Sequence, residues 1–157
     1  MKIALGIDPG IGNTGYAVVR RTATGYQLLS SGYREMSTKA TFGDRLDSHF
    51  ITITDRLMAY EPDILAIESA FFNRNVSSHN STVSVIAIAE LAAHRLGIPT
   101  VQIKPPDVKK AVGCIAKASK DDVKTRVNGI LNANIRNHHE ADACAVAIAA
   151  LLKGNQR

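Results

Sequence analysis

The sequence predicts a single α/β domain over residues 1–157, built on a mixed five-stranded sheet with helices on both faces. Two observations lead to this fold class. Closely spaced β-rich segments come first, and segments of helical period then alternate with short apolar strands. A chain of 157 residues with 45% hydrophobic content can bury one proper core, and no repeat, low-complexity tract or linker divides it.

The first third of the chain is expected to form three strands, at residues 2–8, 16–19 and 26–33. Turn-forming residues at 9–13 and at Thr24–Gly25 separate them. Because the connections are so short, the strands are predicted to pair as antiparallel hairpins.

From Phe42 onward the apolar residues adopt a helical period. Spacings of four, three, four and three predict one face of an amphipathic helix, which Pro62 ends. Residues 63–68 then form a short, almost wholly apolar segment, as expected for a strand covered on both faces. The apolar residues of the helix face are Leu46, Phe50, Ile53, Leu57 and Tyr60.

A second helix is predicted over residues 79–96, with Gly97 as its C-terminal cap, and a strand follows at 100–103. Ser119 and Asp122 form the pattern of a capping box. They open a helix that runs through Val123, Val127 and Leu131, and a last helix is predicted from about His138 to Lys153.

Composition limits the environment and the partners. The formal charge of +5 and a pI near 9.4 favour an anionic partner. Cys114 and Cys144 are far apart, which fits neither a disulfide framework nor a zinc pattern, so reduced thiols in a cytoplasmic protein are expected. The apolar run at 83–93 is too short to span a membrane, and we expect a soluble chain with no membrane partner.

Four polar residues stand where apolar segments would exclude them. Asp8 and Glu68 each end a strand, and His139 and Asp142 lie three apart at the start of an Ala-rich helix. If the two strands are parallel neighbours, both carboxylates emerge at one edge of the sheet. Residues three apart share a helix face, so His139 is favoured, with His138 as the alternative.

Carboxylates at the ends of buried strands are costly unless a cation or hydrogen bonds compensate them. Oxygen-rich ligands suit Mg²⁺ or Mn²⁺, and two such ions are a common device for phosphodiester hydrolysis. Taken singly, each residue also has an ordinary explanation. Asp8 before Pro9-Gly10 is a typical turn residue, and a histidine pair often lies on a surface.

Two further features favour a nucleic-acid partner. Residues 104–126 carry seven basic and three acidic side chains, an arrangement that neutralises phosphates but is also found on plain solvated helices. The adjacent Phe71 and Phe72 follow Glu68 in a polar segment, where they could stack on bases or wedge a duplex, or simply join the core.

Together these segments resemble the RuvC family of Holliday-junction resolvases, from about residue 2 to 152. The motifs that carry the resemblance are Gly6-Ile7-Asp8-Pro9-Gly10, Thr14-Gly15-Tyr16-Ala17, Ala66-Ile67-Glu68 with Phe71 three residues later, Pro106-Asp107-Val108-Lys109, and the terminal helix around Asp142.

The resemblance implies an RNase H-like fold and an endodeoxyribonuclease that cuts four-way junctions during recombination and repair, with Mg²⁺ or Mn²⁺, two ions per site. Asp8, Glu68 and Asp142 would be metal ligands. His139 stands where many members have a fourth carboxylate, which suggests a preference for Mn²⁺ or a proton-shuttle role. Phe71 would intrude at the junction centre. The basic residues that would face the DNA are Arg74, Lys109 and Lys120.

The family also implies a homodimer, formed through the apolar helix after residue 78, and a branch-migration motor complex would be a further partner. Its members can be cytoplasmic, organellar or phage-encoded. Three alternatives stay open: another RNase H-like nuclease for branched nucleic acid, a non-cleaving junction-binding protein weakened at His139, and an actin-like ATPase. The chain is too short to form the two lobes of an actin-like ATPase. The apolar helix residues are Val83, Val85, Ile86, Ala87, Ile88 and Ala89.

Overall fold

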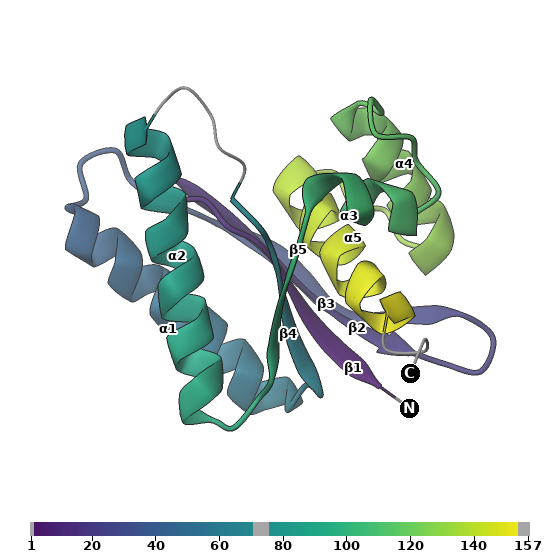
Figure 1. The fold of residues 1–157 in the computed structure, drawn as a ribbon, viewed down its shortest axis with the longest axis horizontal. Coiled ribbons are helices and arrows are strands. Elements are labelled where there is room, and N and C mark those ends of the chain that lie inside the picture. The colour runs from purple at the N-terminus through teal and green to yellow at the C-terminus, as the bar shows by residue number, and fades with distance from the viewer. Residues whose placement is uncertain (1, 71–75, 154–157) are drawn as a thin grey trace.

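The computed structural model describes residues 2–70 and 76–153. Its sheet has the strand order β3-β2-β1-β4-β5 (Figure 1). The strands are β1 (Ile3–Asp8), β2 (Asn13–Arg21), β3 (Tyr26–Glu35), β4 (Ile64–Glu68) and β5 (Thr100–Ile103). The helices are α1 (Phe42–Tyr60), α2 (Val76–Arg95), α3 (Pro105–Ala111), α4 (Lys120–Leu131) and α5 (His138–Lys153).

Strand pairing confirms the mixed sheet. β2 pairs antiparallel with both β1 and β3, whereas β4 runs parallel to β1 and to β5. Ile7 is in register with Ile67, so the residues that follow them, Asp8 and Glu68, end neighbouring strands at the same edge of the sheet. The parallel pairing expected from the sequence is therefore present.

Helices cover both faces of the sheet, as predicted. α1 and α2 lie on one face, and α3, α4 and α5 lie on the other (Figure 1). Alternate residues of β1 reach the two separate cores: Leu5 packs toward the α1–α2 side and Ala4 toward α5. Among the described helices, none is long and apolar enough to cross a bilayer.

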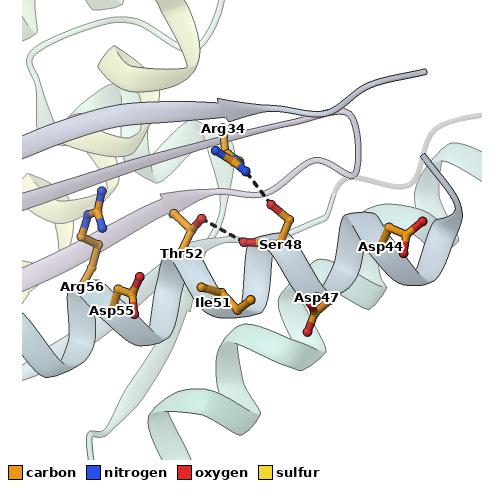
Figure 2. Close-up of a pocket in the computed structure, with 8 residues that line it drawn as sticks. All are labelled: Arg34, Asp44, Asp47, Ser48, Ile51, Thr52, Asp55 and Arg56. Atoms are coloured by element: carbon orange, nitrogen blue, oxygen red, sulfur yellow. Dashed lines mark hydrogen bonds between the residues drawn. The ribbon is translucent and has the colours of Figure 1, made fainter. Parts of the chain in front are cut away.

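The outer side of α1 meets β3 in a shallow polar pocket (Figure 2). Arg34 on β3 donates from Nε to the Ser48 hydroxyl at 3.0 Å. Asp44, Asp47 and Asp55 of α1 also line this pocket. Arg56 of α1 lines the pocket as well, so its wall carries charges of both signs.

Two glycines let α5 lie unusually close to the sheet. A Cβ atom added at Gly15 would stand 2.0 Å from the carbonyl oxygen of His139, and one added at Gly6 would stand 2.2 Å from that of Ala143. Ala147, also small, faces Gly6. The first two turns of α5 therefore rest on backbone atoms of β1 and β2.

The elements differ from expectation in several places, and β2 and β3 also extend further than expected, to Arg21 and Glu35. β2 begins at Asn13 rather than residue 16, because its pairing with β1 continues to the end of that strand, with Asp8 opposite Gly15. α2 begins at Val76 rather than residue 79. α3 was not predicted. It starts with Pro105, and proline is tolerated at the first helical position because an N–H group there would have no partner within the helix.

Gly15→Ala should lower the free energy of unfolding by about 1–3 kcal/mol or more, since no flexible side chain can yield to the new methyl group. Gly129→Ala in α4 is the matched control. A Cβ there meets nothing within 4 Å, so this change should stabilise by about 0.5–1 kcal/mol. Urea unfolding measures both, and equal stability of the Gly15→Ala protein and the unaltered chain would contradict the close approach.

Candidate active site

Three of the predicted carboxylates share one small cavity at the carboxyl edge of the sheet. Asp8 reaches it from the end of β1, Glu68 from the end of β4 and Asp142 from the first turns of α5. The cavity volume is about 160 Å³. Lys109 and Lys120 contribute to its walls, together with Val108 and Val123.

The turn that follows Asp8 is held by two buried residues that the sequence reasoning did not select. The Thr14 hydroxyl donates to the carbonyl of Gly10 at 2.8 Å and accepts from the Gly10 N–H at 3.3 Å. His49 of α1 contacts the carbonyl oxygen of Ile11 through Nε2 at 3.1 Å. Burial lowers the pKa of His49, so the neutral ring with its proton on Nε2 fits as donor. His49 could have been found from the sequence, because it is a polar residue on the otherwise apolar face of the predicted helix that begins at Phe42.

The start of α5 is fixed by Asn137, whose side-chain oxygen accepts from the backbone N–H of His139 at 2.8 Å and of Glu140 at 3.3 Å. This is an N-cap arrangement. His139 and Asp142 then project toward the cavity side of the helix, whereas Glu140 accepts a hydrogen bond from Ser31 at 2.5 Å.

The two adjacent histidines have different neighbours. His139 Nδ1 lies 2.7 Å from Asp8 Oδ2. His138 Nε2 lies 3.7 Å from Asp121 Oδ1, on α4. The structure thus brings His139, rather than His138, to the carboxylate at the end of β1.

The two lysines of the cavity are used differently. Lys120 Nζ lies 3.4 Å from Asp142 Oδ2, while most of the lysine side chain stays exposed. Lys109 Nζ donates to the carbonyl oxygens of Ala116 at 3.0 Å and Ala118 at 2.7 Å. Its ammonium group therefore holds the segment between α3 and α4.

The electrostatics of the cavity reflect the crowding of negative charge. Burial, together with the charges of Asp8 and Asp142, raises the pKa of Glu68 to about 8. Burial and the charge of Asp8 also raise the pKa of Asp142, against the opposing effect of Lys120. The hydrogen bond with Asp8 raises the pKa of His139 above its ordinary value. The metal-free cavity therefore disfavours full ionisation of its carboxyl groups.

The sequence-predicted residues fall into two groups. Asp8, Glu68, His139, Asp142, Lys109 and Lys120 come together around the cavity. Phe71, Phe72 and Arg74 lie outside the described residues. Within residues 2–70 and 76–153, no three His, Cys, Asp or Glu side chains converge closely enough to hold one ion as they stand. Asp8 and Asp142 are instead engaged by His139 and Lys120.

Comparison with known proteins covers nearly the whole chain. The family model of the crossover junction endodeoxyribonuclease RuvC matches residues 4–150. The enzyme of that name from Rubrobacter xylanophilus is 32% identical over 94% of this chain and 83% of its own length. The one from Ruminiclostridium cellulolyticum is 35% identical over 93% and 89%.

Solved structures give the same result. The fold is similar to that of T. thermophilus RuvC in complex with Holliday junction substrate, with a TM-score of 0.90, 27% identity, and coverage of 98% of this chain and 95% of that one. The yeast mitochondrial Holliday junction resolvase Ydc2, at 14% identity and a TM-score of 0.67, shares the fold. The matched model, the relatives and the cavity at the carboxyl edge of the sheet together show that this chain belongs to the RuvC family of crossover junction endodeoxyribonucleases.

Proposed function

We propose that this chain resolves four-way DNA junctions by paired, symmetric nicks in recombination and repair, using divalent-metal-dependent hydrolysis. The observation that carries the proposal is the single cavity in which Asp8, Glu68 and Asp142 meet. Membership in the family supports the substrate, since the similar T. thermophilus protein was solved with a Holliday junction.

The donor set fits Mg²⁺ or Mn²⁺. Three carboxylates with one imidazole are mostly hard oxygen ligands, as both ions prefer. The raised pKa of Glu68 is a further sign that the cavity has more negative charge than Lys120 and His139 balance. Asp8, Glu68, His139 and Asp142 would hold the metal, which when bound would activate water and stabilise the developing charge.

The chain's own residues have separate roles in this scheme. Asp8 and Asp142 would exchange their present contacts with His139 and Lys120 for metal ligation. Lys120, with its side chain 62% exposed, would then be available for a DNA phosphate beside the cavity. Asn137 holds the start of α5 in place, and the hydrogen bond between Thr14 and Gly10 holds the turn after Asp8.

The paired nicks need two matched sites, and a two-fold homodimer would supply them. α2 is the proposed interface. Val83 and Leu91, eight residues apart on this helix, keep 43% and 46% of their surface exposed. Apolar side chains spaced in this way form a stripe that a second copy of the same helix would cover.

Asp8→Asn should abolish nicking while leaving junction binding intact, because the substitution removes a metal ligand and leaves the phosphate contacts that dominate affinity. The assay uses a synthetic four-way junction labelled one strand at a time, with Mg²⁺ or Mn²⁺, and a gel shift in chelator. Loss of junction binding by Asp8→Asn in chelator would contradict this separation of metal binding from DNA binding.

Glu68→Gln should stabilise the metal-free protein increasingly as pH rises. The pKa of Glu68 is raised from 4.5 to about 8, so between these values the folded protein holds a proton that the unfolded chain has lost. Stability of the unaltered chain therefore falls over this window, by on the order of a few kcal/mol, and the amide removes that dependence.

Unfolding in urea with chelator at pH 5 and pH 8 measures this difference. Glu35→Gln, which removes an exposed carboxylate at the end of β3, is the matched control. The same change in stability from pH 5 to pH 8 for the unaltered chain and Glu68→Gln would contradict the assignment.

His139→Asp should shift metal preference from Mn²⁺ toward Mg²⁺, since it replaces a softer imidazole with a carboxylate. The readout is the ratio of nicking rates at saturating concentrations of each ion. His138→Ala, whose ring lies toward Asp121, should leave the ratio unchanged. Equal turnover of the unaltered protein with both ions would count against the Mn²⁺ preference.

A further inference from the structure

The segment that links α3 to α4 presents an isoleucine to solvent. Ile115 keeps 75% of its surface exposed, the largest value among the exposed large hydrophobic residues of the described chain. The segment lies on the sheet face opposite α1 and α2 (Figure 1). An apolar side chain of this size gains free energy when a partner removes it from water.

Ile115 is exposed on an ordered turn. The N–H groups of Gly113 and Cys114 bond to the carbonyls of Lys110 and Lys109 at 3.0 and 2.9 Å, and Gly113 has a φ of +76°. The Ala118 N–H bonds to the carbonyl of Ile115 at 3.0 Å. The backbone of this turn is thus fixed on both sides of the exposed side chain.

The turn is also tied directly to the cavity. Lys109 lines the cavity, and its ammonium group donates to the carbonyls of Ala116 and Ala118, which flank the turn's C-terminal half. Ser119 then caps α4, whose first residue is Lys120, the lysine beside Asp142. Lys109 and Lys120, which both line the cavity, therefore lie at the two ends of the segment that carries this turn.

The surroundings of Ile115 are positively charged. Lys110 and Lys117 are exposed and form no ion pair within the described residues. The nearby acidic residues are already engaged. Asp107 pairs with Lys153, Asp121 pairs with Lys124, and Asp122 accepts from Ser119 in the capping box. Ile115 with Lys110 and Lys117, unpaired among the described residues, suits a DNA duplex. The apolar side chain can pack on the carbon atoms of a sugar, while the lysines contact the phosphates on either side of it.

We propose that Ile115 makes an apolar contact to the DNA substrate. Its side chain packs on deoxyribose in the minor groove of the junction arm beside the cavity, while Lys110 and Lys117 contact the flanking phosphates. This inference rests on the proposed function, because it takes the substrate to be a junction whose scissile phosphate enters the cavity. It adds an apolar contact to a surface otherwise built on charge.

The test separates apolar from ionic contributions by salt dependence. Affinity for a synthetic four-way junction is measured in chelator from 50 to 200 mM salt, for the full chain and four variants. Ile115→Ala should weaken binding roughly fivefold to tenfold without changing the slope of log K against log salt, since no counterion is released at this contact. Lys117→Ala should reduce that slope by about 0.9.

Two controls complete the design. Ile115→Leu keeps the apolar area and should bind within about twofold of the unaltered chain. Met58→Ala removes another large exposed apolar side chain, 62% exposed, from α1 on the opposite face of the sheet, and should leave affinity unchanged. Thermal unfolding of each variant should match the unaltered chain, because both side chains are exposed.

Unchanged affinity of Ile115→Ala would overturn the proposal, as would equal losses for the leucine and alanine variants or an equal loss for Met58→Ala. These outcomes leave the proposed function intact as long as the unaltered chain binds and nicks the junction. Failure of the unaltered chain to bind any four-way junction would instead overturn the proposed function, and this inference with it.

Discussion

Mutual repulsion among three carboxylates is the constraint on which the rest of this structure depends. Asp8, Glu68 and Asp142 come from three separate segments and meet in one partly buried cavity, where the charge of Asp8 disfavours ionisation of both Glu68 and Asp142. Lys120 and His139 offset part of that charge, and the raised pKa of Glu68 indicates that part of the repulsion remains. In the proposed function, a bound divalent cation would relieve this repulsion.

The surrounding scaffold positions the groups that relieve the repulsion. Two capping arrangements matter most: Asn137 fixes the start of α5, which carries His139, and the Ser119–Asp122 box fixes the start of α4, which carries Lys120. Both helices thus point their first turns at the same cavity. The helix N-termini that begin there also offer a positive electrostatic environment to an anionic substrate.

The fold class and the meeting of Asp8 with Glu68 could be predicted because they follow from strand period and parallel pairing. Placing the α5 residues beside them needed the tertiary packing of a helix on the sheet, although their three-residue spacing was readable. The use of Lys109 was not predictable from sequence: a basic residue in a charged segment suggests an outward role, yet the shape of a later turn supplies carbonyls that its ammonium binds. α3 was missed because Pro105-Pro106 reads as an interruption unless its place at the first helical position is known.

The contact of α5 with Gly6 and Gly15 has a consequence for how this site tolerates sequence change. Contacts with main-chain atoms set the distance between the end of β1 and the first turns of α5. Substitutions of one apolar core side chain by another therefore leave this distance unaltered. A site spaced by backbone contact can persist while most of its surroundings diverge. Relatives that share only about a third of their residues with this chain can therefore keep one arrangement of carboxylates, provided these two positions remain without a side chain.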